Sequence, residues 1–195
     1  MSKSLSEMSL EELWQLFPII LKEHNPEYKN WYLEEKEKLK SILSPKSIER
    51  INHIGSTAVS ELLAKPTVDI LLEISSRVEL SKVETKLKKA GWTLMHRNEK
   101  TEELNLVFNK GYTPKGFAAK VFHLHLRFLG DWDELYFRDY LIAHSEISEK
   151  YGKLKKGLEK RYKNNRDGYT EAKSDFIRKW TAEARKIFGQ KYLTK

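Results

Sequence analysis

The sequence predicts an α/β protein whose mixed, partly antiparallel sheet packs helices on one face and has further helices at both ends of the chain. Three observations support this class. Residues 48–128 contain short runs in which apolar and polar side chains alternate, as in strands that are buried on one face. The segments before and after this region repeat apolar residues at helical spacing instead. The strands expected between 92 and 128 are joined by short connections, which favours hairpins and antiparallel pairing.

Local signals place the individual elements along the chain. Ser9 and Glu12 form a capping-box pattern before the first helix. Asn25 can cap a second helix with Pro26 at its first position, and Pro45 ends that helix. The expected elements in order are helices at 10–17 and 26–43, a strand at 48–54, a helix at 57–64, a strand at 67–74, a helix at 80–90, strands at 92–97, 103–109 and 120–128, and helices at 132–144, 145–163 and 170–188.

The first two strands and the helix expected between them predict a crossover connection, in which the strands run parallel. Combined with the later hairpins, this crossover makes the sheet mixed. The length of 195 residues fits a single domain. Its expected parts are an N-terminal helical extension at 1–44, a central α/β unit at 48–128 and C-terminal helices at 132–190.

Composition excludes several classes of protein. The chain has no cysteine, which rules out disulfides, cysteine-bound zinc and thiol catalysis. It has neither an apolar run near the ~20 residues that span a bilayer nor a signal-peptide pattern, so we expect a cytoplasmic protein without membrane contact. The net charge of +8 favours anionic partners. Between residues 150 and 166, eight Lys or Arg accompany one acidic residue; this run is either a solvated helix face or a contact for phosphate or RNA.

Three of the expected strands share one unusual polar face. The strand at 67–74 places Asp69 and Glu73 on it, the strand at 120–128 places His123, His125 and Arg127, and the strand at 103–109 adds Asn105. Two His residues two positions apart point the same way, about 6.5–7 Å apart along the strand. With a carboxylate from a neighbouring strand they could share a metal ion. The alternative is that both imidazoles only make hydrogen bonds on an open sheet face.

Gly55 and Ser56 follow the first strand and precede the expected helix. Unpaired N–H groups at a helix start favour an anion, glycine lets a phosphate approach the backbone, and a serine hydroxyl adds a donor. The alternative is that Ser56 or Thr57 caps the helix and binds nothing. Lys65 precedes Pro66 in an extended turn, where its side chain is either solvated or close to this anion site.

These residues carry a resemblance to a known family. "HIGSTAVSELLAKPTVDI" resembles the signature of the GrpB family, "HLHL" followed by "FRDYLIAHSE" resembles its second block, and "YTEAKSDFI" resembles its C-terminal Tyr-x-x-x-Lys block. One departure is "VSEL" at 59–62, where the family commonly has Val-Pro-Gly-Leu, and we expect this segment to be more regularly helical here. The resemblance implies a nucleotidyltransferase-like fold, in which a Gly-Ser pair cradles a nucleoside triphosphate beside carboxylates that hold two Mg²⁺ ions.

Mapped onto this chain, the resemblance gives Gly55 and Ser56 the phosphate role and Asp69 the first carboxylate. The second carboxylate position is Leu71, and His123 and His125 occupy the place of a third. Glu73 shares the Asp69 face but lies about 13 Å along the strand. The implied catalytic and metal-binding residues are Asp69, His123 and His125. The implied phosphate- or nucleotide-binding residues are Gly55, Ser56, Thr57, Lys65, Arg127, Arg138 and Lys173, with His53, Glu73, Asn105 and Tyr169 as additional candidates.

Three functions remain open from the sequence. The first is a nucleotidyl- or phosphoryl-transferring enzyme that uses a divalent metal (Mg, Mn or Zn) and a nucleoside triphosphate to act on a small molecule. The second is a catalytically inactive protein that binds a nucleotide, another phosphorylated small molecule or RNA, which the apolar residue at 71 favours. The third is a metal-dependent hydrolase with a His-His-Asp centre. The sequence gives no expectation about oligomeric state.

Overall fold

A five-stranded sheet organises the fold. The computed structural model describes residues 3–98 and 104–193, and the strand order is β1-β2-β5-β4-β3. Only the central β2–β5 pair is parallel, and the other neighbouring strands are antiparallel, so the predicted mixed sheet is confirmed. The strands are β1 (Ile48–Ile54), β2 (Val68–Ile74), β3 (Thr93–Asn98), β4 (Asn105–Thr113) and β5 (Gly116–Phe128).

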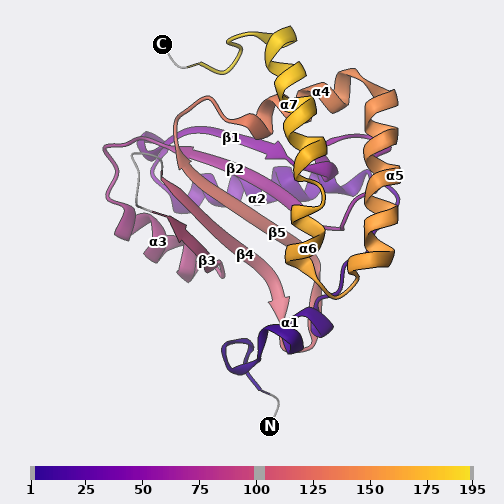
Figure 1. Cartoon of the computed structure of the whole chain (residues 1–195). Coiled ribbons are helices and arrows are strands. Elements are labelled where there is room, and N and C mark those ends of the chain that lie inside the picture. Colours follow the sequence, from indigo (N-terminus) through magenta and orange to yellow (C-terminus); the bar gives the residue numbers. More distant parts are fainter. Residues whose placement is uncertain (1–2, 99–103, 194–195) are drawn as a thin grey trace.

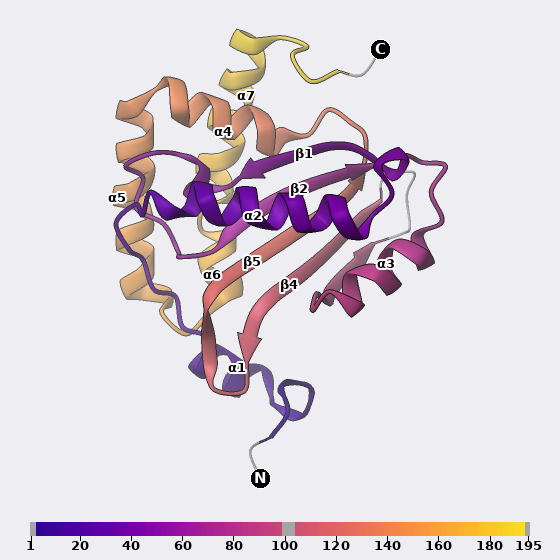
Figure 2. The same ribbon diagram turned by 180° about the vertical axis from the view of Figure 1, so that it is seen from behind.

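Helices lie on both faces of this sheet. Helices α2 and α3 cross one face (Figure 2), whereas α4 to α7 stand beside the other face near β1, β2 and β5 (Figure 1). The short α1 lies at the end of the β4–β5 hairpin. The helices are α1 (Leu10–Leu16), α2 (Glu27–Ile42), α3 (Leu80–Lys89), α4 (Asp133–Ala143), α5 (Ser145–Tyr162), α6 (Arg166–Glu171) and α7 (Ser174–Phe188), with 3₁₀ turns at Leu5–Glu7, Pro45–Ser47 and Ser56–Ala58. No helix in the described ranges is long and apolar enough to span a bilayer.

The main core fills the space between the sheet and helices α2 and α3. Alternate residues of three strands point into it, as the sequence predicted, and remove apolar surface from water at roughly 25 cal/mol per Å². Its fully buried strand residues are Val68, Ile70, Leu72, Ile74, Leu106, Phe108, Leu124 and Leu126. A second apolar cluster joins α4, α5 and α7 with the segment after β1. The two cores leave the polar face of β2 and β5 between them.

Three expectations about local structure are wrong. Strands β1 and β2 pair antiparallel, so the predicted crossover does not exist. The helix expected at 57–64 is only a 3₁₀ turn at Ser56–Ala58, because the backbone is extended at Val59 and has a positive φ at Glu61. A helix cannot continue through such residues. The helix expected at 170–188 is divided into α6, which starts earlier after Asn165, and α7. Residue 103, expected to begin a strand, lies outside the described ranges.

Glu61 occupies the position where the GrpB-like motif has glycine, and its φ of 62° lies in the region that favours glycine. We expect Glu61→Gly to raise the free energy of unfolding by about 0.5–1 kcal/mol. The left-handed backbone costs an L-residue about 1–2 kcal/mol, and the extra freedom of glycine in the unfolded chain offsets about 0.4–1 kcal/mol of this. Thermal unfolding should show a Tm about 1–4 °C higher. Ser60→Gly is the control and should lower Tm; equal Tm values for both variants would contradict strain at Glu61.

Candidate anion-binding site

Strands β2 and β5 bring the predicted acid and imidazoles together. Because the two strands are parallel neighbours, Asp69 pairs with His123 in register and Leu71 pairs with His125. The Asp69 Oδ1 atom lies 3.0 Å from Nδ1 of His123 and 3.8 Å from Nε2 of His125. The first contact is a hydrogen bond, and the second is too long to be one.

Electrostatics fixes the protonation of the Asp69–His123 pair. Burial favours a raised pKa for Asp69, but the hydrogen bond from His123 and the contact with His125 outweigh it and hold the pKa below its usual range. Burial lowers the pKa of His123, so its imidazole is neutral at pH 7. Since a carboxylate only accepts, Nδ1–H of His123 donates to Asp69. Its Nε2 then accepts from the hydroxyl of Tyr112 at 2.7 Å, and this hydroxyl accepts from Arg166 at 3.2 Å.

The Gly55–Ser56 turn lies directly against Asp69. Gly55 has φ +70°, and a Cβ atom there would lie 2.4 Å from Asp69 Oδ2, so only glycine allows this approach. The Ser56 hydroxyl accepts a 2.9 Å hydrogen bond from Nζ of Lys155. Lys155 also donates to the carbonyl of Leu63. The turn therefore joins the carboxylate to a buried ammonium group.

Four cationic side chains gather around this single carboxylate. Lys155 is 3% exposed. The ammonium groups of Lys65 and Lys173 lie 5.8 and 4.5 Å from the centre of the same ring, that of Tyr169. Burial, followed by repulsion from neighbouring cations, lowers the pKa of Lys155 to about 7, and the same two causes, with Arg166 among the cations, lower that of Lys65 to about 7. Burial is also the largest cause that lowers the pKa of Lys173, to about 8.

These cations have few anionic partners of their own. Within the described ranges, the ammonium groups of Lys65 and Lys173 make no hydrogen bond or ion pair, and the guanidinium group of Arg166 donates only to Tyr112. The cavity that exposes Asp69 has a volume of about 590 Å³ and reaches from the Gly55–Ser56 turn to α4 and α7. The four cations do not line this cavity, whose own arginines and acidic residues are equal in number, so the excess of positive charge lies on the side of Asp69 that faces away from it.

Sequence reasoning missed Lys155, Arg166 and Tyr112. Lys155 belongs to the basic run at 150–166, but it continues the buried stripe of α5 that includes Tyr151 and Gly152. This helical spacing is the feature of the sequence that could have indicated that Lys155 is buried. Tyr112 lies beyond the strand expected at 103–109, because β4 continues to Thr113 through an irregularity in its pairing with β5.

Two predicted phosphate-binding arginines line the Asp69 cavity but are engaged in ion pairs with neighbouring carboxylates. Arg127 pairs with Glu134 at 2.7 Å, although it lines the same cavity as Asp69. Arg138 pairs with Asp139 at 2.7 Å and donates to the backbone carbonyl of His53, which ties α4 to β1. Their charges are compensated, in contrast to those of the lysines.

The remaining candidates lie around the site in supporting positions. Thr57 is buried, donates to the carbonyl of Thr67 and contacts Nε2 of His53 at 3.0 Å, so it fastens the turn. Burial lowers the pKa of His53 to about 4. Asn105 begins β4, which lies on the far side of β5 from β2. The ring of Tyr169 is buried, and the ammonium groups of Lys65 and Lys173 lie over it. Glu73 is completely buried and pairs with Arg50.

The donor atoms around Asp69 fit a metal poorly. Across residues 3–98 and 104–193, no three His, Cys, Asp or Glu side chains are arranged to hold a metal ion. Both ring nitrogens of His123 already have partners, Asp69 and Tyr112. Leu71, at the position of a second carboxylate, is fully buried in an apolar cluster between β1 and α4. One carboxylate and one free imidazole do not match the oxygen ligands that two Mg²⁺ ions require.

Comparisons with known proteins show the family. UPF0157 protein YqkA of Bacillus subtilis is 32% identical over 82% of this chain, which spans only 45% of that relative. Glutamate-rich protein GrpB of Alkalihalophilus pseudofirmus is 33% identical over 82% of this chain and 91% of its own length. The crystal structure of conserved protein GrpB from Enterococcus faecalis superposes with a TM-score of 0.71 and 29% identity, covering 87% of this chain and 99% of that chain.

A more distant structural similarity is to Cid1 poly(U) polymerase with Mg and 3′-dATP bound. Its TM-score is 0.49 at 13% identity, over 84% of this chain and 51% of that chain. This value is too low to inform the chemistry of the site. The model of the family described as GrpB protein matches residues 18–183. Since this match includes most of the chain, the chain belongs to the GrpB family.

Proposed function

We propose that the site binds a nucleotide or another phosphorylated small molecule through its phosphate groups. The observation that carries the proposal is an excess of cations: buried Lys155 and partly buried Lys65, Lys173 and Arg166 lie near one carboxylate, Asp69. Like charges repel one another more strongly where water is partly excluded, so gathering these cations destabilises the ligand-free protein. A bound polyphosphate would replace this repulsion with attraction. The phosphates would also reach the Ser56 hydroxyl beside Gly55, where no Cβ atom blocks their approach.

The proposal concerns binding and does not require a metal. The donor set at Asp69 does not suit the two-Mg²⁺ chemistry of nucleotide transfer, so the lysines supply the positive charge that metal ions supply elsewhere. In this arrangement burial keeps His123 neutral, and its hydrogen bonds with Asp69 and Tyr112 fix its ring. RNA is the competing ligand, because it presents the same phosphate charge; a ligand with clustered phosphates suits this compact set of cations better than an extended strand does.

Thermal unfolding with inorganic tripolyphosphate, ATP and a short RNA, each with and without Mg²⁺, tests the proposal. We expect tripolyphosphate and ATP to raise Tm without Mg²⁺. At 100 times its dissociation constant, each ligand should raise the free energy of unfolding by about 2.7 kcal/mol. Lys155→Met and Lys173→Met should each lower the affinity for tripolyphosphate roughly 10- to 100-fold, because each removes a charge-assisted contact of about 1.5–3 kcal/mol. Lys156→Met is the matched control, since it removes an exposed charge from the same helix and should leave the affinity unchanged.

Three results would contradict the proposal. One is the absence of any Tm shift with tripolyphosphate or ATP. Another is an equal loss of affinity in Lys155→Met and Lys156→Met, which would show only a general effect of net charge. The third is a shift that requires Mg²⁺ and disappears in Asp69→Asn, because the proposal expects removal of this negative charge to leave metal-free anion binding intact or tighter.

A further inference from the structure

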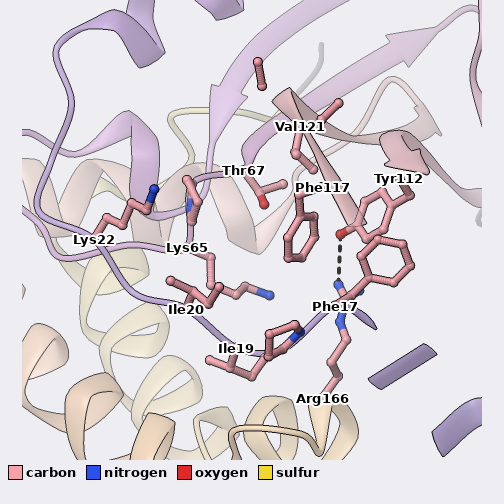
Figure 3. Close-up of a pocket in the computed structure, with 14 residues that line it drawn as sticks. Phe17, Ile19, Ile20, Lys22, Lys65, Thr67, Tyr112, Phe117, Val121 and Arg166 are labelled. Atoms are coloured by element: carbon pink, nitrogen blue, oxygen red, sulfur yellow. Dashed lines mark hydrogen bonds between the residues drawn. The ribbon is translucent and has the colours of Figure 1, made fainter. Parts of the chain in front are cut away.

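A second cavity is lined by Tyr112, whose hydroxyl donates to His123, and it shares no lining residue with the Asp69 cavity. Its volume is about 350 Å³. Figure 3 shows the rings of Phe17, Phe117 and Tyr112 on one side, with Ile20 and the Lys65 side chain on the other. Lys65 and Arg166, two members of the cationic set, line this cavity and not the Asp69 cavity. The cavity therefore adjoins the proposed phosphate site through shared residues.

The N-terminal segment 17–22, called the strap below, forms one wall of this cavity. Hydrogen bonds at both ends fasten the strap to segments that are distant in sequence. Lys22 exchanges backbone hydrogen bonds of 2.8 and 3.0 Å with Ala64, the residue before Lys65. The amide of Ile19 donates to the carbonyl of Lys163 at 2.7 Å, and the amide of Leu21 to the Glu159 carboxylate at 2.7 Å. The strap is thus a fixed wall of the cavity.

The cavity exposes apolar surface that a folded protein normally covers. Phe117 and Ile20 are each 39% exposed and belong to the few large apolar side chains in the described ranges with this exposure. The Phe117 ring lies 5.0 Å from that of Phe17 and 5.4 Å from that of Tyr112, so the three rings form one aromatic surface. Burying such surface is favourable, and the cavity is concave enough for a small molecule.

The charged groups of this cavity are all cationic, and the hydroxyl-bearing side chains Thr67 and Tyr112 also line it. Its charged side chains are Lys22, Lys65 and Arg166, and among the described residues that line it there is no Asn, Gln, Asp or Glu. These walls suit an apolar ring or a short branched chain attached to an anion.

We propose that this cavity is a second subsite, which holds the apolar part of a ligand whose tetrahedral anion lies at Lys65 and Arg166. The inference rests on the proposed phosphate site for the identity of the anion, but the apolar subsite has its own walls and its own test. The ligand is an amphiphilic anion: an aromatic or branched aliphatic group carrying a phosphate. The strap is then part of the binding site.

Two dyes test the apolar subsite without knowledge of the natural ligand. 1-Anilinonaphthalene-8-sulfonate has an aromatic body and a tetrahedral anion, and N-phenyl-1-naphthylamine has the same rings without the anion. We expect the sulfonate dye to bind the native protein at one site, with a fluorescence increase, and at least 5-fold more tightly than the neutral dye. Lys65→Met should weaken the sulfonate dye at least 5-fold and leave the neutral dye unchanged. Ala119→Phe, which fills the cavity, should weaken both dyes.

Met95→Phe is the control for the filling variant, because Met95 is an exposed strand residue (58%) that does not line the cavity. It should leave both dyes unaffected. Equal binding of the sulfonate dye to wild type and Ala119→Phe would overturn the inference, and so would a Lys65→Met variant that affects both dyes equally. If tripolyphosphate fails to bind but the sulfonate dye shows the expected pattern, the apolar subsite stands and the phosphate proposal falls. If tripolyphosphate binds and neither dye does, the reverse holds.

Discussion

Arg50→Met should lower the free energy of unfolding by about 3–5 kcal/mol, because it leaves a buried carboxylate without its counter-charge. The partner is Glu73 of β2, whose side chain is fully buried. Nε and Nη2 of Arg50 lie 2.5 and 2.6 Å from the two carboxylate oxygens, so the pair is bidentate. Arg50 also donates to the carbonyl of Gly130, and the amide of Gly130 donates back to Glu73. The pair therefore joins β1, β2 and the loop after β5.

Equilibrium unfolding in urea measures this loss. A second substitution, Glu73→Gln in the Arg50→Met background, should recover part of the stability, since it removes the unpaired charge and keeps the shape. The exposed pair of Lys40 and Glu37 supplies the comparison, and Lys40→Met should cost no more than about 0.5 kcal/mol. A loss below about 1 kcal/mol for Arg50→Met, or a double variant less stable than the single one, would contradict a buried pair as the anchor of this edge.

Glu73 also shows what the sequence can and cannot indicate. The alternation of β2 places Glu73 on the same face as Asp69, and the structure has it there. Alternation does not reveal that an arginine lies on the adjacent strand and neutralises it. That information depends on the register of β1 against β2, where Arg50 is opposite Glu73. The sequence therefore predicts the polar face correctly but does not separate its anchoring residues from its ligand-binding ones.

The connection between β1 and β2 could not be predicted for a different reason. The segment 57–64 contains no proline or glycine that would break a helix, so local propensity favours a helix there. Tertiary contacts override it: Val59 and Leu62 are buried against α4 and α5, and Ala64 pairs with Lys22 of the strap. Each of these partners is distant in the sequence. Helix propensity differences of a few tenths of a kcal/mol per residue cannot compete with such burial.

The cationic set was partly predictable. Lys65 and Lys173 stand in family-like motifs, so resemblance singled them out. Lys155 and Arg166 lie in a run of basic residues that is equally typical of a solvated helix face. The position of Lys155 under the Ser56 turn depends on how α5 packs against the segment after β1, a contact between residues 99 positions apart.

Between pH 7 and pH 9 the ligand-free protein should become more stable, a trend that follows from its buried lysines. The folded pKa values of Lys65, Lys155 and Lys173 are about 7, 7 and 8, below the value of 10.5 in an exposed lysine. In this window the unfolded chain holds protons that the folded protein has released, so the free energy of unfolding rises with pH. The destabilisation is largest below pH 7 and decreases as the pH rises toward 10.5, the pKa of the lysines in the unfolded chain.

The size of this effect should be roughly 2 kcal/mol over the two pH units. One such lysine contributes at most about 1.4 kcal/mol per pH unit, and three that repel one another titrate as a set and not independently. For a chain of this size the rise corresponds to about 4–8 °C in Tm. Above about pH 10 the trend should reverse, because burial raises the pKa values of Tyr112 and Tyr151 and their ionisation then favours the unfolded chain.

Two experiments, one with tripolyphosphate and one with a substitution, test whether the lowered pKa values of the lysines cause this pH dependence. A bound polyphosphate keeps the lysines protonated, so its Tm shift should be largest near pH 7 and shrink toward pH 9, which reduces the rise. Lys155→Met should raise stability at pH 7 and flatten the profile, while Lys156→Met should reproduce the wild-type profile because its ammonium group is exposed. A wild-type profile that falls from pH 7 to pH 9, or one that Lys155→Met leaves unchanged, would show that these lysines keep ordinary pKa values. The repulsion among the lysines, which is the reason to expect a phosphate ligand at this site, would then be absent.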